Sequence, residues 1–302
     1  MGYLFLSFAL LAGVTKGYCG KRTGDLTKTV GDAISVNFLR MIICMAVGIL
    51  LVLAGGQGHA LKVEPIQLLL MALSGVTTTI FVVTWIVSVK RGAYLLLEVF
   101  LMLGVLVPII CSLFIYKEAV APMQWVGIAL LVLSAYLMCS YSNREKAKIT
   151  PVSLLLLTLC GLSSGATDFL QKAFVNTAPE TPISVFNFYS YTVSACLLLP
   201  LLIALNKGSV KVAYEGAKII LKKAAGYVTI MALCLFLHSY FKTAAAGYLS
   251  ATTLYPISQG GGLVLSVIMT TLCFKEKLTL KCLFGICIAF LGVLLINLKN
   301  FL

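Results

Sequence analysis

Charged side chains are scarce in this chain of 302 residues, where Asp, Glu, Lys and Arg together make up 11% of the sequence. Hydrophobic residues account for 60%, and the mean hydropathy is +1.03. A soluble domain of this length needs many more polar side chains to cover its surface. The composition excludes a soluble globular protein and predicts an all-α polytopic membrane protein.

Residues that bind metals or act as nucleophiles are also few. The only two histidines, His59 and His238, belong to no cluster with the spacing of metal ligands. The ten cysteines are spread over the apolar segments and form no CxxC pair, so we interpret them as small packing residues. No GxxxxGK[ST] phosphate-binding loop is present. The sequence therefore predicts no metal, no cofactor and no enzymatic activity.

What the sequence does contain is a series of long apolar runs separated by short turns. A hydrocarbon core of about 30 Å requires roughly 20 apolar residues per helix, so each run predicts a transmembrane helix. Because the turns at Arg91-Gly92 and Ala246-Gly247 are very short, nine spans is an alternative to ten. The runs cover residues 2–20, 34–56, 66–89, 92–115, 120–140, 151–172, 182–206, 224–245, 247–273 and 278–298.

The net charge of +13 predicts the orientation of the chain in the membrane. The basic residues are scattered among the loops, which argues against a nucleic-acid-binding patch. Most of them follow odd-numbered runs. Because positive loops stay in the cytoplasm, both termini are expected outside, in a multi-pass protein of the cell membrane. The few basic residues assigned to the opposite face are Lys62, Lys117, Lys172 and Lys299.

Two short motifs recur and indicate an internal duplication. The turn Tyr116-Lys117-Glu118 matches Phe274-Lys275-Glu276, and Ile34-Ser35-Val36 returns unchanged as Ile183-Ser184-Val185. Each copy contains five runs, and an odd number turns the second copy upside down in the membrane. The sequence therefore predicts ten transmembrane helices as two inverted five-helix repeats. The expected boundaries are 1–142 for the first repeat, 143–150 for a polar linker and 151–302 for the second repeat.

The order of these motifs carries a resemblance to a known family. The segments 124–131 and 283–292 and the stretch Asn37-Phe38-Leu39-Arg40 resemble helices of the drug/metabolite transporter superfamily, in particular its EamA-like ten-helix branch. The resemblance implies a basket of helices with a central cavity that exports or exchanges small metabolites. The chain departs from the family pattern because neither Lys-Glu turn has a Gly before its Glu.

Five ionisable residues fall inside the apolar runs: Lys16, Arg40, Glu98, Asp168 and Lys242. Each costs at least about 2.5–3.5 kcal/mol at the bilayer centre, so each is expected to face a partner or a water-filled cavity. Counting residues places the first three at one depth, where we expect a charge cluster, and the last two toward the outer face. We hypothesise that these two layers bind substrate or act as gates.

Glu98 is the leading candidate for proton coupling, because its sequence neighbours are apolar. In the alternative interpretation, Lys16 and Arg40 extend to the membrane interface and Glu98 neutralises one of them. Three basic residues against two acidic ones favour an anionic or zwitterionic substrate.

Uncharged polar residues and a proline–glycine segment complete the predicted site. The candidates to hydrogen-bond a substrate are Asn37, Asn187, Tyr94 and Gln259. Around Gln259, a proline and three consecutive glycines predict a kink or an unwound hinge, with tight helix packing as the alternative. The residues of this predicted hinge are Pro256, Gly260, Gly261 and Gly262.

Two further pairs of glycines have the small-xxx-small spacing. They are Gly13/Gly17 in the first run and Gly161/Gly165 in the sixth. Because small residues four positions apart let two helix backbones approach each other, both pairs predict close helix packing.

These features together predict a secondary transporter of small polar or amphipathic metabolites that works by alternating access. The expected partners are a small-molecule substrate, the lipid bilayer and a coupled proton or ion, with no nucleic acid. The protein is expected to be a monomer or homodimer. The alternatives are a membrane-embedded transferase enzyme and a channel.

Overall fold

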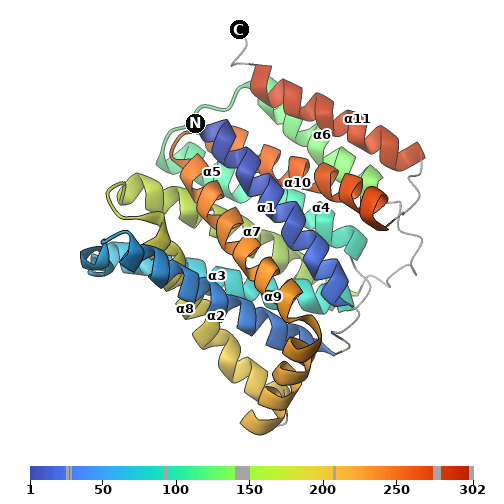
Figure 1. Cartoon of the computed structure of the whole chain (residues 1–302). Coiled ribbons are helices and arrows are strands. Elements are labelled where there is room, and N and C mark those ends of the chain that lie inside the picture. Colours follow the sequence, from blue (N-terminus) through green and yellow to red (C-terminus); the bar gives the residue numbers. More distant parts are fainter. Residues whose placement is uncertain are drawn as a thin grey trace.

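The computed structural model describes residues 1–24, 27, 29–90, 94–139, 150–206, 209–274 and 280–298. Within these residues the regular structure is entirely helical (Figure 1). The α-helices are α1 (Gly2–Gly24), α2 (Val30–Ala54), α3 (Pro65–Lys90), α4 (Tyr94–Gly104), α5 (Leu106–Ile115), α6 (Pro122–Cys139), α7 (Pro151–Thr177), α8 (Ile183–Leu205), α9 (Val210–Ala246), α10 (Ala251–Phe274) and α11 (Leu280–Asn297), and a 3₁₀ turn covers Gly58–Leu61.

The helices form the ten predicted spans. Seven are long and apolar enough to cross a membrane, and three shorter apolar segments, Val99–Ile115, Pro122–Leu137 and Leu283–Asn297, account for the rest. The fourth span is divided into α4 and α5 at Val105. Helix α9 joins a preceding helical segment to the eighth span across a kink at Ala224, where φ is −142° and ψ is 24°. The prediction of ten transmembrane helices is therefore confirmed.

Local sequence signals set where several helices begin. The Thr29 side chain accepts a hydrogen bond from the Asp32 amide at 3.0 Å, and the Asp32 carboxylate accepts one from the Thr29 amide at 2.9 Å, so α2 starts with a complete capping box. At the start of α7, Thr150 caps the Ser153 amide and Pro151 occupies the first turn. These caps satisfy backbone amides that have no partner inside the helix.

The two halves of the chain are inverted relative to each other. The equivalent helices α2 and α8 pack together, with Gly31 beside Asn206 and Gly48 beside Phe188. Residues near the start of α2 thus contact the end of α8, and later residues of α2 contact the first turns of α8. The two helices, which are the second helices of their repeats, therefore run in opposite directions. The last helices of the halves, α6 and α11, also pack together at one edge of the bundle (Figure 1).

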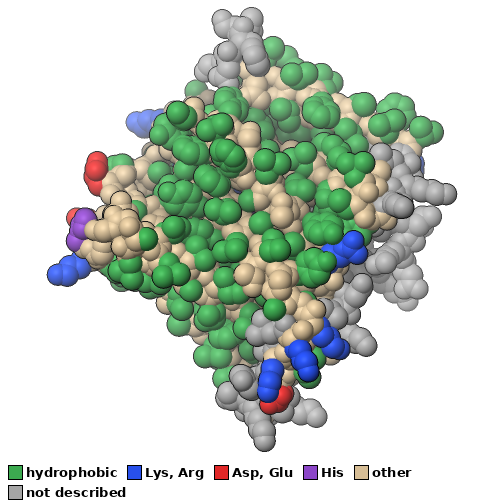
Figure 2. All heavy atoms as spheres, viewed as in Figure 1, with side chains coloured by type: hydrophobic (Ala, Val, Ile, Leu, Met, Phe, Trp, Pro, Cys, Tyr) green, Lys and Arg blue, Asp and Glu red, His purple; other side chains and the backbone are tan. Residues whose placement is uncertain are grey.

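Packing between the halves follows the same symmetry. Helix α1 lies along α9, and its counterpart in the second half, α7, lies along α3. Likewise α2 contacts α9, and α8 contacts α3. The six helices in these pairs surround the centre of the molecule, where both halves contribute side chains. Hydrophobic side chains cover the middle of the visible surface, while charged ones gather toward its ends (Figure 2), as expected for a protein surrounded by lipid.

The paired glycines lie where backbones touch. Gly161 and Gly165 of α7 face the backbone of α4 at Phe100 and Gly104, so they provide the close packing that the sequence predicts. Gly13 leaves space for the ring of His238. A Cβ atom at Gly17 would meet nothing within 4 Å, so no close helix contact occurs at this glycine among the described residues.

The ninth span is not unwound in this conformation, while a kink at its proline–glycine segment stays a prediction. Helix α10 continues without interruption from Ala251 to Phe274, through Pro256 and the glycines that follow it. Pro256 lies in the second turn, so its missing N–H removes only a hydrogen bond to a carbonyl of the first turn. The backbone at this proline therefore stays helical.

The three glycines of the predicted hinge are helical too, which corrects the expectation of an unwound backbone at Gly260, Gly261 and Gly262. A Cβ atom at Gly260 would lie against the Leu131 side chain of α6. Gly261 and Gly262 both lie beside the Leu10 side chain of α1. Because these glycines face neighbouring helices, the structure favours the packing alternative, and a hinge motion at this segment stays a prediction.

Candidate functional site

A buried ion pair lies where α7 and α9 meet. The Lys242 ammonium lies 2.5 Å from a carboxylate oxygen of Asp168, and each side chain is only 12% exposed. Removing both charges from water is costly, and this close contact offsets part of the cost. The sequence placed both residues toward the outer face without pairing them, and the structure joins them.

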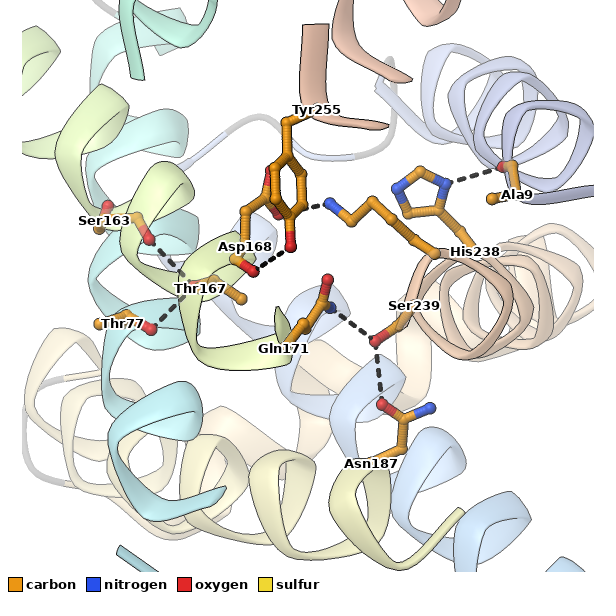
Figure 3. A network of polar contacts seen from close by, with 11 residues as sticks. Ala9, Thr77, Ser163, Thr167, Asp168, Gln171, Asn187, His238, Ser239 and Tyr255 are labelled. Atoms are coloured by element: carbon orange, nitrogen blue, oxygen red, sulfur yellow. Dashed lines mark hydrogen bonds and ion pairs between the residues drawn. The ribbon is translucent and has the colours of Figure 1, made fainter. Parts of the chain in front are cut away.

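Hydrogen bonds hold the backbone around Asp168 (Figure 3). The hydroxyl of Tyr255 in α10 donates to the Asp168 carbonyl oxygen at 2.6 Å. The preceding residue, Thr167, shares a hydrogen bond of 2.8 Å with Thr77 of α3 in the first half and donates to the Ser163 carbonyl. The turn of α7 that carries Asp168 is therefore tied to both α3 and α10.

Ser239 is the centre of a second group of polar side chains one turn away (Figure 3). Its hydroxyl accepts a hydrogen bond from Gln171 Nε2 at 3.2 Å and donates to Asn187 Oδ1 at 2.9 Å. The remaining amide atoms, Gln171 Oε1 and Asn187 Nδ2, are buried without a partner among the described residues. This leaves one acceptor and one donor unsatisfied, which is typical of polar groups that bind a ligand or water.

His238 connects α9 to the first helix. Its Nδ1 lies 2.8 Å from the Ala9 carbonyl oxygen. Because a carbonyl only accepts, Nδ1 carries the proton in this contact. With Thr77–Thr167, this is the second polar contact in Figure 3 that joins the two halves. No group of metal-ligating side chains is found among the residues that the structure describes.

Lys16 and Arg40 are the members of the expected inner charge cluster whose side chains the structure describes. The Arg40 Nη1 atom donates to Asn37 Oδ1 at 2.6 Å, and Asn37 Nδ2 donates to the Ala33 carbonyl at 2.8 Å. Lys16 interacts electrostatically with both Arg40 and Lys242. Within the expected cluster, Lys16 thus interacts electrostatically with Arg40, and it also interacts with the Asp168–Lys242 pair.

The other predicted site residues are less informative. The backbones of Glu98 and Tyr94 belong to α4, but their side chains are not among those that the structure describes. The second Lys-Glu turn, Lys275-Glu276, lies outside the described residues. Gln259 is half-buried in α10 and makes no hydrogen bond to a described residue.

Sequence reasoning missed Gln171, Ser239 and Tyr255. For the first two, the available signal is spacing along a helix: Gln171 follows Asp168 by three positions, and Ser239 precedes Lys242 by three, so each pair shares a helix face.

The first Lys-Glu turn forms a second buried ion pair near the ends of α5 and α7. A Glu118 oxygen lies 2.9 Å from the Lys172 ammonium, and the other accepts a hydrogen bond from the Ala251 amide at 2.8 Å. Lys172 also donates to the carbonyls of Ala246 and Leu249. The pair thereby fixes the turn before α10 and places a carboxylate at the positive end of that helix.

Helix α7 extends further than the sequence predicts, and the turn before Glu118 contains a left-handed residue. The sequence ended the sixth run at Lys172 and counted this lysine on the membrane face opposite the basic loops, but α7 continues to Thr177 and buries Lys172 in its last two turns. Lys117 has a φ of +53°, a left-handed conformation that favours glycine. The family's usual Gly before the Glu fits this requirement.

Replacing Glu118 with Gln is expected to lower the melting temperature of the purified protein. The change leaves the Lys172 charge buried without its carboxylate, at a cost of about 1–3 kcal/mol. The matched control is Lys117→Gln, which alters an exposed neighbour with no buried partner among the described residues. Equal melting temperatures for both variants would contradict the proposed stabilising role of the Glu118–Lys172 pair.

A cleft of about 440 Å³ lies between the end of α2, the α7–α8 connection and α9. Polar side chains line much of it, including Gln57, Glu180, Thr181 and Ser184. The lining residue from α9 is Tyr240, which directly follows Ser239. Two residues of its lining, Ser184 and Tyr240, belong to the same helices as Asn187 and Ser239 of the polar group.

Comparison with known proteins identifies the family. The model of the EamA-like transporter family matches residues 2–140 and again residues 151–298. No individual curated protein sequence matches the chain. A solved structure described only as "Crystal structure of protein" has the same fold, with a TM-score of 0.73 at 16% identity over 99% of this chain and 96% of that one. With both halves matched, the chain belongs to the EamA-like transporter family of the drug/metabolite transporter superfamily.

Proposed function

We propose that this protein is a secondary transporter that exports or exchanges small polar or amphipathic metabolites by alternating access. The observation that carries the proposal is the Asp168–Lys242 pair, a buried ion pair at the centre of two inverted halves. A purely structural bundle gains little from such a pair, because apolar residues of similar volume are often as stable.

Two contacts between the halves suit such a cycle. Thr77–Thr167 and His238–Ala9 are single hydrogen bonds, which break at modest cost when one half rocks against the other. The cleft beside Tyr240 is then the proposed outer entrance to the site, and Ser239, Gln171 and Asn187 are its proposed ligands for polar substrate groups.

We further propose that the loops after odd-numbered spans are cytoplasmic and that both termini are outside. The exposed Lys218, Lys222 and Lys223 of α9 then face the cytoplasm, in agreement with the positive-inside rule. Energy is proposed to come from an ion gradient or from exchange. For proton coupling, we propose that the Asp168 carboxylate accepts a proton when Lys242 moves away.

The test of this function begins with purified protein and a thermal-shift screen against metabolite classes. Compounds that stabilise the protein are then offered to proteoliposomes with and without a pH gradient. Saturable uptake supports a carrier. Ion flux far above carrier rates would instead establish a channel, and chemical conversion of the compound would establish an enzyme.

A further inference from the structure

We propose that Lys16 and Arg40 form a binding site for an oxyanion, the carboxylate or phosphate group of the transported substrate. This inference rests on the proposed function and names the substrate class. It follows from charge balance, unused hydrogen-bond donors and the position of the two side chains between the halves.

Charge balance is the first observation. Lys16 interacts electrostatically with two other basic residues, Arg40 and Lys242, and with the Asp168 carboxylate, which is bonded to Lys242. Neither Lys16 nor Arg40 forms an ion pair within the described part of the chain. Two like charges repel each other strongly where no bulk water screens them. A bound anion removes this repulsion, which gives the site a preference for negatively charged ligands.

Unused donors are the second observation. Arg40 uses Nη1 to bind Asn37, which the Ala33 carbonyl holds in place, while Arg40 Nε is buried without a partner among the described residues. Lys16 donates no hydrogen bond to a described residue. A guanidinium with free N–H groups binds planar or tetrahedral oxyanions through two oxygens, and an ammonium adds a point charge.

The position of the two side chains is the third observation. Lys16 comes from α1 and Arg40 from α2, and both helices pack against α9 of the second half. The Cys44 thiol, one turn after Arg40, donates to the Ala232 carbonyl at 3.2 Å, which fixes α2 to α9 there. The site therefore lies at the junction of the halves, where alternating access requires a substrate to bind.

Lys242 links this site to the outer ion pair. It contacts Asp168 in the present conformation and also interacts electrostatically with Lys16. A substrate anion that enters from the cleft competes with Asp168 for Lys242 and is then bound by Lys16 and Arg40. The unpaired amide atoms of Gln171 and Asn187 suit an uncharged polar part of the same substrate.

Binding to the purified full-length protein tests the proposal. The probes are succinate, glycerol 3-phosphate and inorganic phosphate, with succinamide and glycerol as uncharged counterparts and putrescine as a cation. We expect at least one oxyanion to raise the melting temperature in a saturable manner and the uncharged and cationic probes to have no effect. Succinate against glycerol 3-phosphate separates a carboxylate from a phosphate ligand.

Variants then assign the binding to these two residues. Lys16→Gln and Arg40→Gln are each expected to weaken oxyanion binding by about tenfold or more, and Lys16→Arg is expected to retain it. Lys62→Gln, at an exposed lysine, is the control. The melting temperature of each ligand-free variant shows that it is folded.

Two results would overturn the inference: equal binding of charged and uncharged probes, or unchanged oxyanion affinity in folded Lys16→Gln and Arg40→Gln proteins. Either result leaves the proposed transport function standing if proteoliposomes still take up another compound. Transport itself fails separately, when no stabilising compound enters proteoliposomes at all.

Discussion

An Asp168→Asn protein is expected to insert into the membrane, to lose stability and to lose transport by at least a factor of about 100. The substitution leaves the Lys242 ammonium buried without its carboxylate, and breaking a buried pair in this way costs about 3–5 kcal/mol. The measurements are the melting temperature in detergent and the initial rate of uptake into proteoliposomes.

The double variant Asp168→Asn/Lys242→Gln separates stability from function. Removing both charges removes the unpaired group, so the melting temperature is expected to recover most of the loss. Transport is expected to remain lost, because the proposed proton site at Asp168 and the contact of Lys242 with the substrate anion are gone. Wild-type uptake by either variant would show that the pair has no part in the transport path.

The second large effect is expected at the crossing of α4 and α7. A Cβ atom at Gly165 would collide with the Gly104 carbonyl oxygen, which belongs to the backbone and cannot rotate away. Gly165→Ala is therefore expected to destabilise the protein by about 1–3 kcal/mol through overpacking.

Gly17→Ala and Gly226→Ala are the matched controls, because a Cβ atom at either position meets nothing within 4 Å. Alanine is the better helix former by about 1 kcal/mol, so the controls are expected to be neutral or slightly stabilising. The measurement is the melting temperature of each purified protein. A Gly165→Ala protein as stable as the controls would contradict the backbone contact between α4 and α7.

The spans and the duplication were predictable from the sequence because both depend on local or repeated features. An apolar run long enough to cross the hydrocarbon core has few alternatives to a helix. Five runs per copy then force the inversion that the packing of α2 against α8 displays. Depth counting placed Asp168 and Lys242 at one level, although it did not show that they touch.

The uncharged part of the candidate site was not predictable in the same way. A Ser, Gln or Tyr in a membrane helix carries little cost, so Ser239, Gln171 and Tyr255 do not stand out until helix rotation brings them together. The pairing of Glu118 with Lys172 depends on how far α7 extends. Helix ends and rotations follow from packing between distant segments, which no local pattern reports.

The most direct test of alternating access is solute counterflow in proteoliposomes loaded with a transported compound. The wild-type protein is expected to accumulate labelled compound transiently above its equilibrium level, because a carrier exchanges one molecule for another. The Asp168→Asn/Lys242→Gln protein is expected to show no such overshoot. Equilibration without an overshoot in the wild-type protein, or an overshoot of equal size in the double variant, would contradict the account.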